Sequence, residues 1–244
     1  MSERDRIAYV DCASGASAEM FMGALLDAGL LEVDLREVLA PLQRAGAAFE
    51  VEVRQVMKGP VAAVQVGIVG QVQRVQARLP DMLAVLQSAQ LPEQVADSAA
   101  AVLRRVAREE ARIAGQRPDH YLFDGTRGID SVVGAAGVIG ALATLDVGSV
   151  LSSPVNVGQA EPVVAALLAH APTYADSPGI SLVTPLGAAL LAELVSEWTA
   201  SPPFAGGMVG HGAGVRDLPK PNVMRCFLGY GTISGATAQT RPER

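Results

Sequence analysis

Residues 7–21 constrain the fold more than any other segment, because they predict a strand, a glycine-containing turn and a helix in direct succession. The strand is a short apolar run that ends at Asp11, and the apolar residues after the turn recur with helical spacing. Ser17 stands where a helix N-cap is expected, and Gly29 where the helix would stop. Such a junction is a common place for α/β proteins to bind phosphate or a small molecule.

The polar residues of this junction have two interpretations. Asp11 and Glu19 are carboxylates near element ends and are candidate metal ligands, while Ser14, Gly15 and Ser17 could bind a cofactor through hydroxyl and backbone N–H groups. The alternative is structural. Asp11 and Ser14 would then form hydrogen bonds only with the turn backbone, and the carboxylate of Glu19 would be stabilised by the positive end of the helix dipole.

Composition excludes several classes of protein. Half of the 244 residues are hydrophobic and only 4% are aromatic, while the formal net charge is -6. This acidic balance argues against nucleic acid or an anionic membrane as partner. Lys58 and Lys220 are the only lysines, so arginine carries nearly all of the positive charge. Cys12 and Cys226 are the only cysteines, fall in predicted strands and are expected to be free thiols.

The chain shows no signal peptide, so a cytoplasmic location is the default expectation. Residues 132–145 are too short and too rich in glycine to span a bilayer and predict a buried helix that begins at Asp130. Gly134, Gly137 and Gly140 would each cost an isolated helix roughly 1 kcal/mol. We therefore expect this helix to pack tightly against its neighbours.

Strands and helices alternate along the chain without a strict repeat. Residues 49–56 and 61–69 alternate apolar and polar side chains and predict a pair of strands, and Thr184 caps a predicted helix over residues 185–198. This mixture favours an α/β or α+β fold, with a mixed sheet packed by helices in a layered domain. The domain would cover residues 1–233, with a division into two sublobes left open, and 234–244 would be a polar tail.

The chain contains no local zinc motif, because its histidines are far apart in the sequence. They are His120, His170 and His211. A site assembled from distant segments remains open, and the carboxylates Asp11, Glu19 and Asp130 suit magnesium or manganese better than a soft metal. Asp130 and Glu19 also fit a simple role at the start of a helix.

Residues 210–217 superficially resemble a phosphate loop, but no lysine follows and nearby prolines prevent a following helix, so the fingerprint is not that of a nucleotide-binding loop. Arg216 could still bind a phosphate or carboxylate with two parallel hydrogen bonds. The alternative is an ion pair of Arg216 with Asp217 or Asp11. His211 in the same segment is a further candidate for cofactor binding. No nucleophile elbow occurs, so acyl transfer has little support.

Five segments together carry a family resemblance. They are residues 11–29, 128–133, 153–158, 182–189 and 212–228. In this order they resemble the N-terminal domain of the LarC family of nickel-insertion proteins. The resemblance implies insertion of nickel into a pyridinium bis-thiocarboxylate mononucleotide, a cyclometallase-type (lyase) reaction that needs CTP and a divalent cation such as Mg or Mn.

The departures from the family pattern concentrate in polar positions. Ala18-Glu19 replaces glycine and aspartate, residues 71–78 contain no histidine, and Leu122-Phe123-Asp124-Gly125 replaces a histidine-rich block. A segment with cysteine and histidine is missing between Gly158 and Glu161. This pattern predicts a retained fold with altered or weakened metal chemistry.

The resemblance covers only the first domain of the family, so it implies a separate CTP-binding domain or polypeptide as partner. A small nucleotide precursor is the expected ligand, and self-association stays open. In this interpretation the metal ligands would be Asp11, Glu19 and Asp130, and the cofactor-binding residues Ser14, Gly15, Ser17, His211 and Arg216. A competing hypothesis is a noncatalytic subunit that binds a ligand or partner but has lost the nickel site.

Overall fold

The computed structural model describes residues 5–70, 77–123, 127–176, 179–204 and 207–231. Within them, a seven-stranded mixed sheet has the order β2-β3-β10-β11-β1-β6-β9. Its strands are β1 (Asp5–Asp11), β2 (Phe49–Lys58), β3 (Val61–Gly70), β6 (Val147–Ser152), β9 (Val195–Trp198), β10 (Met208–Ala213) and β11 (Val223–Gly231). Two short pairs are β4 (Ala77–Arg78) with β5 (Leu122–Phe123), and β7 (Val155–Asn156) with β8 (Thr173–Tyr174).

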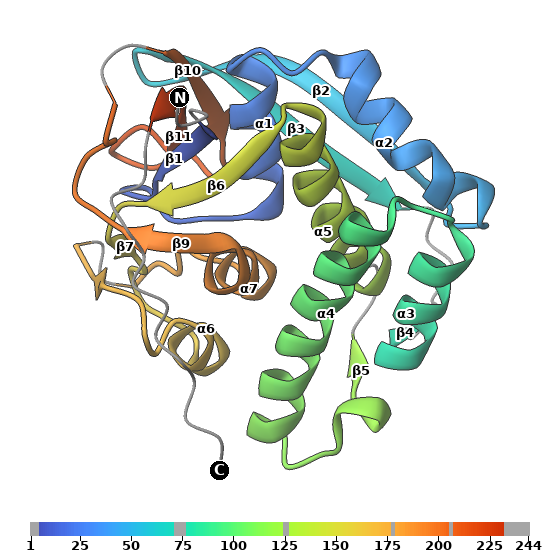
Figure 1. Cartoon of the computed structure of the whole chain (residues 1–244). Helices are drawn as coiled ribbons and strands as arrows, with labels where there is room; N and C mark the ends of the chain where they lie inside the picture. Colours follow the sequence, from blue (N-terminus) through green and yellow to red (C-terminus); the bar gives the residue numbers. More distant parts are fainter. Residues whose placement is uncertain (1–4, 71–76, 124–126, 177–178, 205–206, 232–244) are drawn as a thin grey trace.

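The helices gather on one side of this sheet (Figure 1). They are α1 (Ala18–Asp27), α2 (Glu32–Arg44), α3 (Leu79–Ser88), α4 (Glu93–Ile113), α5 (Arg127–Thr144), α6 (Pro162–Leu167) and α7 (Pro185–Leu194), with a short 3-10 turn at Pro118–His120. Alternation along β1 explains the layering, since Ala8 and Val10 join the helical core while Ile7 and Tyr9 pack with Leu151 on the opposite face. The expected α/β fold with a mixed sheet is confirmed.

The glycine-rich segment that superficially resembles a phosphate loop forms strand β10 and a seat for helix α1. A Cβ atom on Gly212 would lie 1.8 Å from the Met20 carbonyl oxygen, and one on Gly210 would lie 2.1 Å from the Ala24 carbonyl oxygen. These glycines therefore let the helix lie directly on the strand. The closeness fixes where the first turn of α1 stands relative to the loop that follows β10.

Helix α5 packs as tightly as its glycines predict. A Cβ atom would meet side chains of Leu186 and Ala18 at Gly134, Met22 at Gly137 and Val38 at Gly140, each within 3 Å. The predicted start at Asp130 is wrong, because α5 already begins at Arg127 and Asp130 lies in its first turn.

The predicted helix over residues 185–198 is too long. Thr184 caps α7 by accepting a hydrogen bond from the Gly187 N–H, but the helix ends at Leu194. Residues 195–198 instead form β9, because Val195 enters the sheet as a parallel partner of Val150.

The two cysteines lie in or directly after central strands of the sheet. Cys226 lies in β11, whereas Cys12 follows the last residue of β1; both thiols are free and buried. None of the helices that the structure describes is long and apolar enough to cross a membrane. The predicted tail over residues 234–244 lies outside the described part of the chain.

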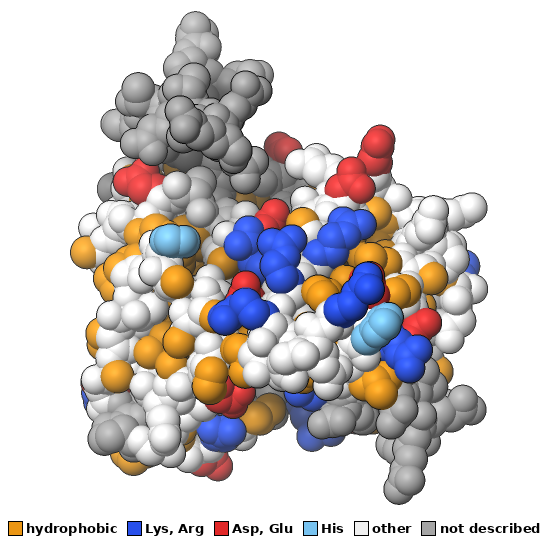
Figure 2. All heavy atoms as spheres, turned by 90° about the horizontal axis from the view of Figure 1, so that it is seen from below, with side chains coloured by type: hydrophobic (Ala, Val, Ile, Leu, Met, Phe, Trp, Pro, Cys, Tyr) orange, Lys and Arg blue, Asp and Glu red, His pale blue; other side chains and the backbone are white. Residues whose placement is uncertain are grey.

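Basic side chains gather on one face in spite of the acidic net charge. Figure 2 shows this face, seen from below Figure 1, with Lys and Arg side chains among hydrophobic and acidic ones. Figure 1 shows that the end of α4 points to this side. Along α4, Arg104, Arg108 and Arg112 are exposed at intervals of four residues. Arg105 pairs with Glu193 on α7. The face is therefore a mixed surface and not a continuous basic stripe.

Candidate functional site

The turn between β1 and α1 is joined to the segment that leads into α7. The N–H of Ala16 donates to the Leu182 carbonyl (3.2 Å), and the N–H of Thr184 donates to the Ala16 carbonyl (3.0 Å). Gly15 has φ +87°, and a Cβ there would lie 2.0 Å from the Leu182 carbonyl oxygen. Gly15 thus allows two distant segments to meet, and the starts of α1 and α7 become neighbours.

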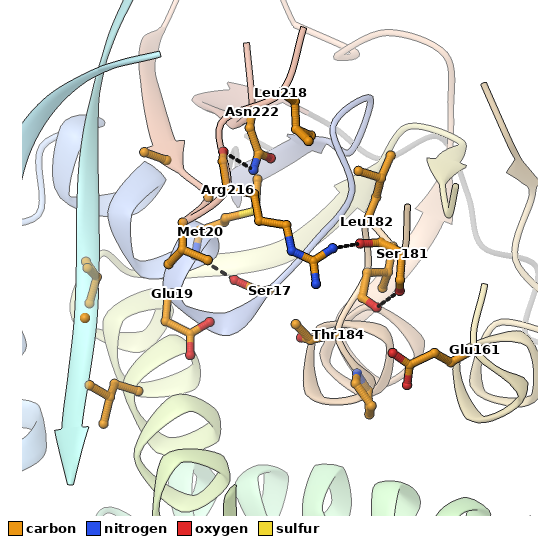
Figure 3. Close-up of a pocket in the computed structure, with 18 residues that line it drawn as sticks. Ser17, Glu19, Met20, Glu161, Ser181, Leu182, Thr184, Arg216, Leu218 and Asn222 are labelled. Atoms are coloured by element: carbon orange, nitrogen blue, oxygen red, sulfur yellow. Dashed lines mark hydrogen bonds between the residues drawn. The ribbon is translucent and has the colours of Figure 1, made fainter. Parts of the chain in front are cut away.

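A pocket of about 410 Å³ opens where these two helix starts face the loop after β10 (Figure 3). Ser17 caps α1 by accepting a hydrogen bond from the Met20 N–H, and Thr184 caps α7 in the same way. Free N–H groups at helix starts favour anionic ligands. The polar and charged side chains of the pocket are Ser17, Glu19, Glu161, Ser181, Thr184, Arg216 and Asn222.

Arg216 is the basic residue of this pocket. Its Nη1 donates to the Ser181 carbonyl at 3.0 Å, and its side chain points toward the pocket interior (Figure 3). The predicted alternative of an ion pair with Asp217 or Asp11 is wrong, since Asp217 pairs with Lys58 and Asp11 pairs with Arg225. Within the described residues Arg216 has no carboxylate partner, so its remaining donors can serve an anionic ligand.

Two carboxylates also reach this space. Glu19 and Glu161 line the 410 Å³ pocket and a second pocket of about 350 Å³ beside it, which Asp130, Ser131 and Arg127 line as well. Figure 3 shows Glu19 coming from α1 and Glu161 from the start of α6. Neither side-chain carboxylate has a hydrogen-bond or ion-pair partner among the described residues, whereas Arg127 pairs with the buried Glu110. Sequence reasoning missed Glu161, because a glutamate before Pro162 signals only a helix start.

The structure does not gather the predicted metal ligands into one cluster. Glu19 and Asp130 line the same pocket, but Asp11 accepts a hydrogen bond from the Ala13 N–H (3.0 Å) and pairs with Arg225. In the described ranges, no three His, Cys, Asp or Glu side chains stand close enough to hold a metal ion.

His211 lies away from the pocket. Its backbone N–H donates to the Asp27 carboxylate (2.8 Å), and its ring nitrogen Nδ1 is 3.4 Å from the same group. Asp27 is the last residue of α1, whereas Ser17 caps the first turn. The predicted cofactor-binding residues Ser17 and Arg216 thus line one pocket, while His211 stands at the opposite end of the helix.

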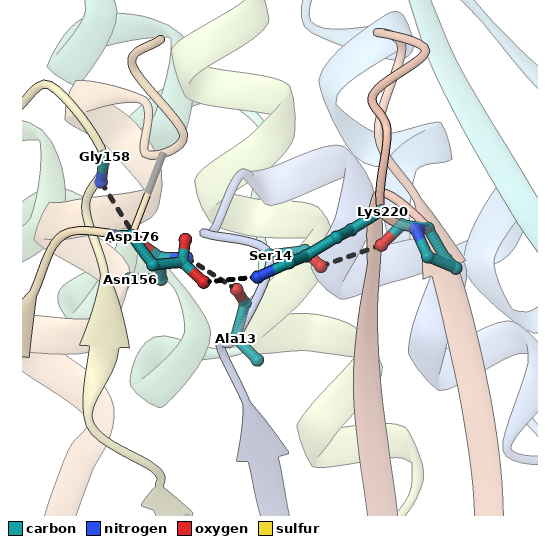
Figure 4. Close-up of polar contacts among 7 residues, drawn as sticks. Ala13, Ser14, Asn156, Gly158, Asp176 and Lys220 are labelled. Atoms are coloured by element: carbon teal, nitrogen blue, oxygen red, sulfur yellow. Dashed lines mark hydrogen bonds and ion pairs between the residues drawn. The ribbon is translucent and has the colours of Figure 1, made fainter. Parts of the chain in front are cut away.

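Ser14 lines a third pocket of about 270 Å³ beside the first. Its hydroxyl donates to the Pro221 carbonyl at 2.9 Å, and Asn156 donates to the Ala13 carbonyl at 2.9 Å (Figure 4). Lys220 pairs with Asp176 at 2.8 Å, and Asp176 accepts from Asn156. These contacts tie the opening turn to the loop that carries Arg216.

The two cysteines are free, fully buried thiols. Burial raises the pKa of Cys12 and of Cys226 to about 12. Neither thiol lines any of the three pockets described above. Among the residues that line the 410 Å³ pocket, Met20 carries a thioether sulfur.

The fold is that of a layered α/β protein with a pocket at the starts of α1 and α7. The pocket holds oxygen donors and Arg216, which has no carboxylate partner among the described residues. A family model described as nickel insertion protein matches residues 8–243. The chain therefore belongs to the nickel insertion protein family.

Individual relatives agree with this assignment. The chain is 30% identical to a pyridinium-3,5-bisthiocarboxylic acid mononucleotide nickel insertion protein of Desulfitobacterium hafniense, over 92% of this chain and 58% of the relative. It is 31% identical to a protein of the same name from Nocardioides, over 93% of this chain and 61% of the relative. The chain thus spans about three fifths of the length of these relatives. No solved structure matches it.

Proposed function

We propose that this chain holds a pyridinium-3,5-bisthiocarboxylic acid mononucleotide while nickel is inserted into it, in assembly of the nickel-pincer cofactor. The family and the names of the relatives support this function. The observation that carries it is Arg216, which reaches into a 410 Å³ pocket and has no carboxylate partner among the described residues. The mononucleotide is anionic and needs such a group.

The guanidinium of Arg216 would bind the phosphate or a thiocarboxylate of the mononucleotide through two parallel hydrogen bonds. The N–H groups at the starts of α1 and α7, which Ser17 and Thr184 cap, would add a favourable field for the same charge. In this proposal Ser14 and Gly15 shape the turn beside the pocket. His211, which pairs with Asp27, receives no ligand contact.

Nickel is a substrate in this scheme. Glu19, Glu161 and Asp130 line the neighbouring 350 Å³ pocket and would offer it oxygen ligands as it enters. Carboxylates without histidine or thiolate would hold the ion weakly. The sulfur atoms of the mononucleotide would then supply the ligands that the protein lacks, so transfer toward the organic ligand is favoured.

CTP and a Mg or Mn ion enter the proposal through a partner. The matched relatives continue well beyond the aligned part, since the alignment covers 58% of one and 61% of the other. We place the CTP-binding function in a separate domain or polypeptide that acts with this chain. The chain described here would contribute the mononucleotide and nickel pockets.

Calorimetry with the mononucleotide tests the proposal. Arg216→Gln removes the charged donor, and we expect affinity to fall by at least about tenfold, or 1.4 kcal/mol. Arg54→Gln is the matched control, because Arg54 lies on β2 and pairs with the exposed Glu52. Equal affinity of the Arg216→Gln variant and the wild type would contradict the proposal.

A noncatalytic binding subunit is the second candidate, and the lack of a three-residue metal cluster in the described ranges favours it. Metal analysis and cofactor formation with a CTP-binding partner separate the two. Nickel insertion that Glu19→Gln lowers while mononucleotide binding stays intact supports the first function. Mononucleotide binding without any nickel uptake supports the second.

A further inference from the structure

The backbone of Arg216 is held from two sides, and one of the groups that hold it is a buried lysine from a distant hairpin. The Arg216 carbonyl accepts a hydrogen bond from the Asn222 side-chain amide at 3.0 Å and a longer one from Lys58 Nζ at 3.4 Å. Lys58 is the last residue of β2, so it is 158 positions away in the sequence. Its contact with the loop is a product of the fold.

Burial makes the Lys58 contacts consequential. The Lys58 side chain is only 8% exposed, although lysine almost always keeps its ammonium group in water. A buried ammonium is costly unless its protons are bonded, and Lys58 Nζ finds Asp217 at 2.7 Å as well as the Arg216 carbonyl. Since the Asp217 side chain is 93% exposed, the ion pair alone would be weakly stabilising. Lys58 therefore restrains the backbone of the loop at Arg216, which an ion pair between two exposed side chains would not do.

Asn222 closes the same loop from its other end. The Gly214 N–H donates to the Asn222 carbonyl at 2.9 Å, and the Asn222 side chain is packed against Gly214, where a Cβ atom would lie 2.4 Å from Nδ2. Asn222 is 7% exposed, so its amide has little access to water. The backbone of Arg216 is thus held by Asn222 and Lys58, and its guanidinium is bonded to the Ser181 carbonyl, so little freedom remains to be lost when an anion binds.

We propose that Lys58 is a positioning residue of the anion site: it holds the backbone of Arg216 so that the guanidinium enters the 410 Å³ pocket. This inference rests on the proposed function only for the identity of the ligand. Positioning reduces the conformational freedom that a long side chain loses on binding, and this loss otherwise weakens affinity. Lys58 itself does not line the pocket.

The first test needs no ligand. Proton–nitrogen NMR of ¹⁵N-labelled protein identifies the Arg216 Nε–H signal by its loss in Arg216→Gln. In Lys58→Met, which keeps the length of the buried stem and removes the ammonium, we expect this signal to shift toward the position of a freely rotating arginine. An unchanged Arg216 signal in Lys58→Met would overturn the inference, whatever the ligand is.

Asp217→Asn is the matched control for this test. It removes the exposed partner of Lys58 but keeps the ammonium beside the Arg216 carbonyl, so we expect the Arg216 signal to stay in place. Asn222→Asp supplies a second variant in case Lys58→Met does not fold, because it replaces the amide donor by an acceptor. We expect it to displace the same Arg216 signal, and an unchanged signal would again count against positioning.

Affinity for the mononucleotide gives the second test. We expect Lys58→Met to weaken binding about tenfold in the wild-type background and to have no further effect in Arg216→Gln, since both changes remove one interaction. An equal loss in both backgrounds would show a general structural role and reject positioning. If the wild type does not bind the mononucleotide, the proposed function fails, while the NMR test still decides the role of Lys58.

Discussion

The polar side chains Asp11 and Ser17, at the two ends of the opening turn, make structural contacts. Asp11 bonds the Ala13 N–H and pairs with Arg225, and Ser17 caps α1. Residue types alone predict the cap and the turn, because serine and aspartate bond nearby backbone groups. They do not reveal Arg225, which lies 214 positions away and meets Asp11 only when β11 pairs with β1.

Asp11→Asn separates a metal ligand from a turn residue. Because the carboxylate already serves Ala13 and Arg225, we expect unchanged mononucleotide and nickel binding and a loss of about 1 kcal/mol in the free energy of unfolding. Urea denaturation and calorimetry measure the two quantities. Asp97→Asn, at an exposed position of α4, is the control and should change neither. Loss of nickel binding in Asp11→Asn would contradict this expectation and indicate that Asp11 is a nickel ligand.

At the scale of elements, periodicity predicts the long helices well and the glycine-rich strands poorly. The apolar stripe and the terminal signals of α1 are local, and Gly29 with φ +113° follows its end as expected. Strand β10 carries Gly210 and Gly212, which have little intrinsic preference for a strand. It forms because β11 pairs with it and α1 covers it, and neither partner can be identified from the segment itself.

The same difference applies to the pocket. Arg216 could be named from its residue type, but the pocket needs the starts of α1 and α7, and Gly15 brings those together through a contact with Leu182. Lys58, Asn222 and Glu161 carry no local motif. These three residues lie at or beside the pocket only because the folded chain brings distant segments together.

Gly212→Ala tests the seat of α1. The new methyl group would lie 1.8 Å from the Met20 carbonyl, so the helix must move, and we expect the free energy of unfolding to fall by about 3 kcal/mol. Gly67→Ala on β3 is the control, since its nearest neighbour would be the Glu52 side chain at 3.8 Å. Chemical denaturation measures both variants. A stability loss as small as that of the control would contradict the close packing of α1 on β10.

At the scale of the whole molecule, both cysteine thiols and the side chain of Tyr9 are buried at the central strands of the sheet. Cys12 and Cys226 are buried on the helical side of the sheet, and Tyr9 is buried on the other, where its ring packs against Phe227. Burial raises the pKa of the two thiols from 9.0 to about 12, and burial with the nearby Asp11 raises that of Tyr9 from 10.0 to about 12. The folded protein therefore keeps protons that the unfolded chain releases.

This difference sets the direction of alkaline destabilisation. The unfolded chain loses thiol protons above about pH 9 while the folded chain holds them, so the free energy of unfolding should fall between about pH 9 and pH 12. Urea midpoints between pH 8 and pH 11 measure the slope. Cys226→Ala should make it shallower, and Tyr230→Phe on an exposed position should leave it unchanged. An identical slope in Cys226→Ala would contradict the contribution of this thiol.

The two lysines have a practical consequence for any binding measurement. Lys58 is 8% exposed and Lys220 is 76% exposed, so an amine-reactive ester should acylate Lys220 readily and Lys58 hardly at all. Lys220 stands on the loop of Arg216 and lines the 270 Å³ pocket. A biosensor surface coupled through lysine would therefore tether the protein by the loop that carries Arg216. The rate at which Lys58 is acylated, in turn, measures how often the loop of Arg216 and Asp217 moves away from Lys58.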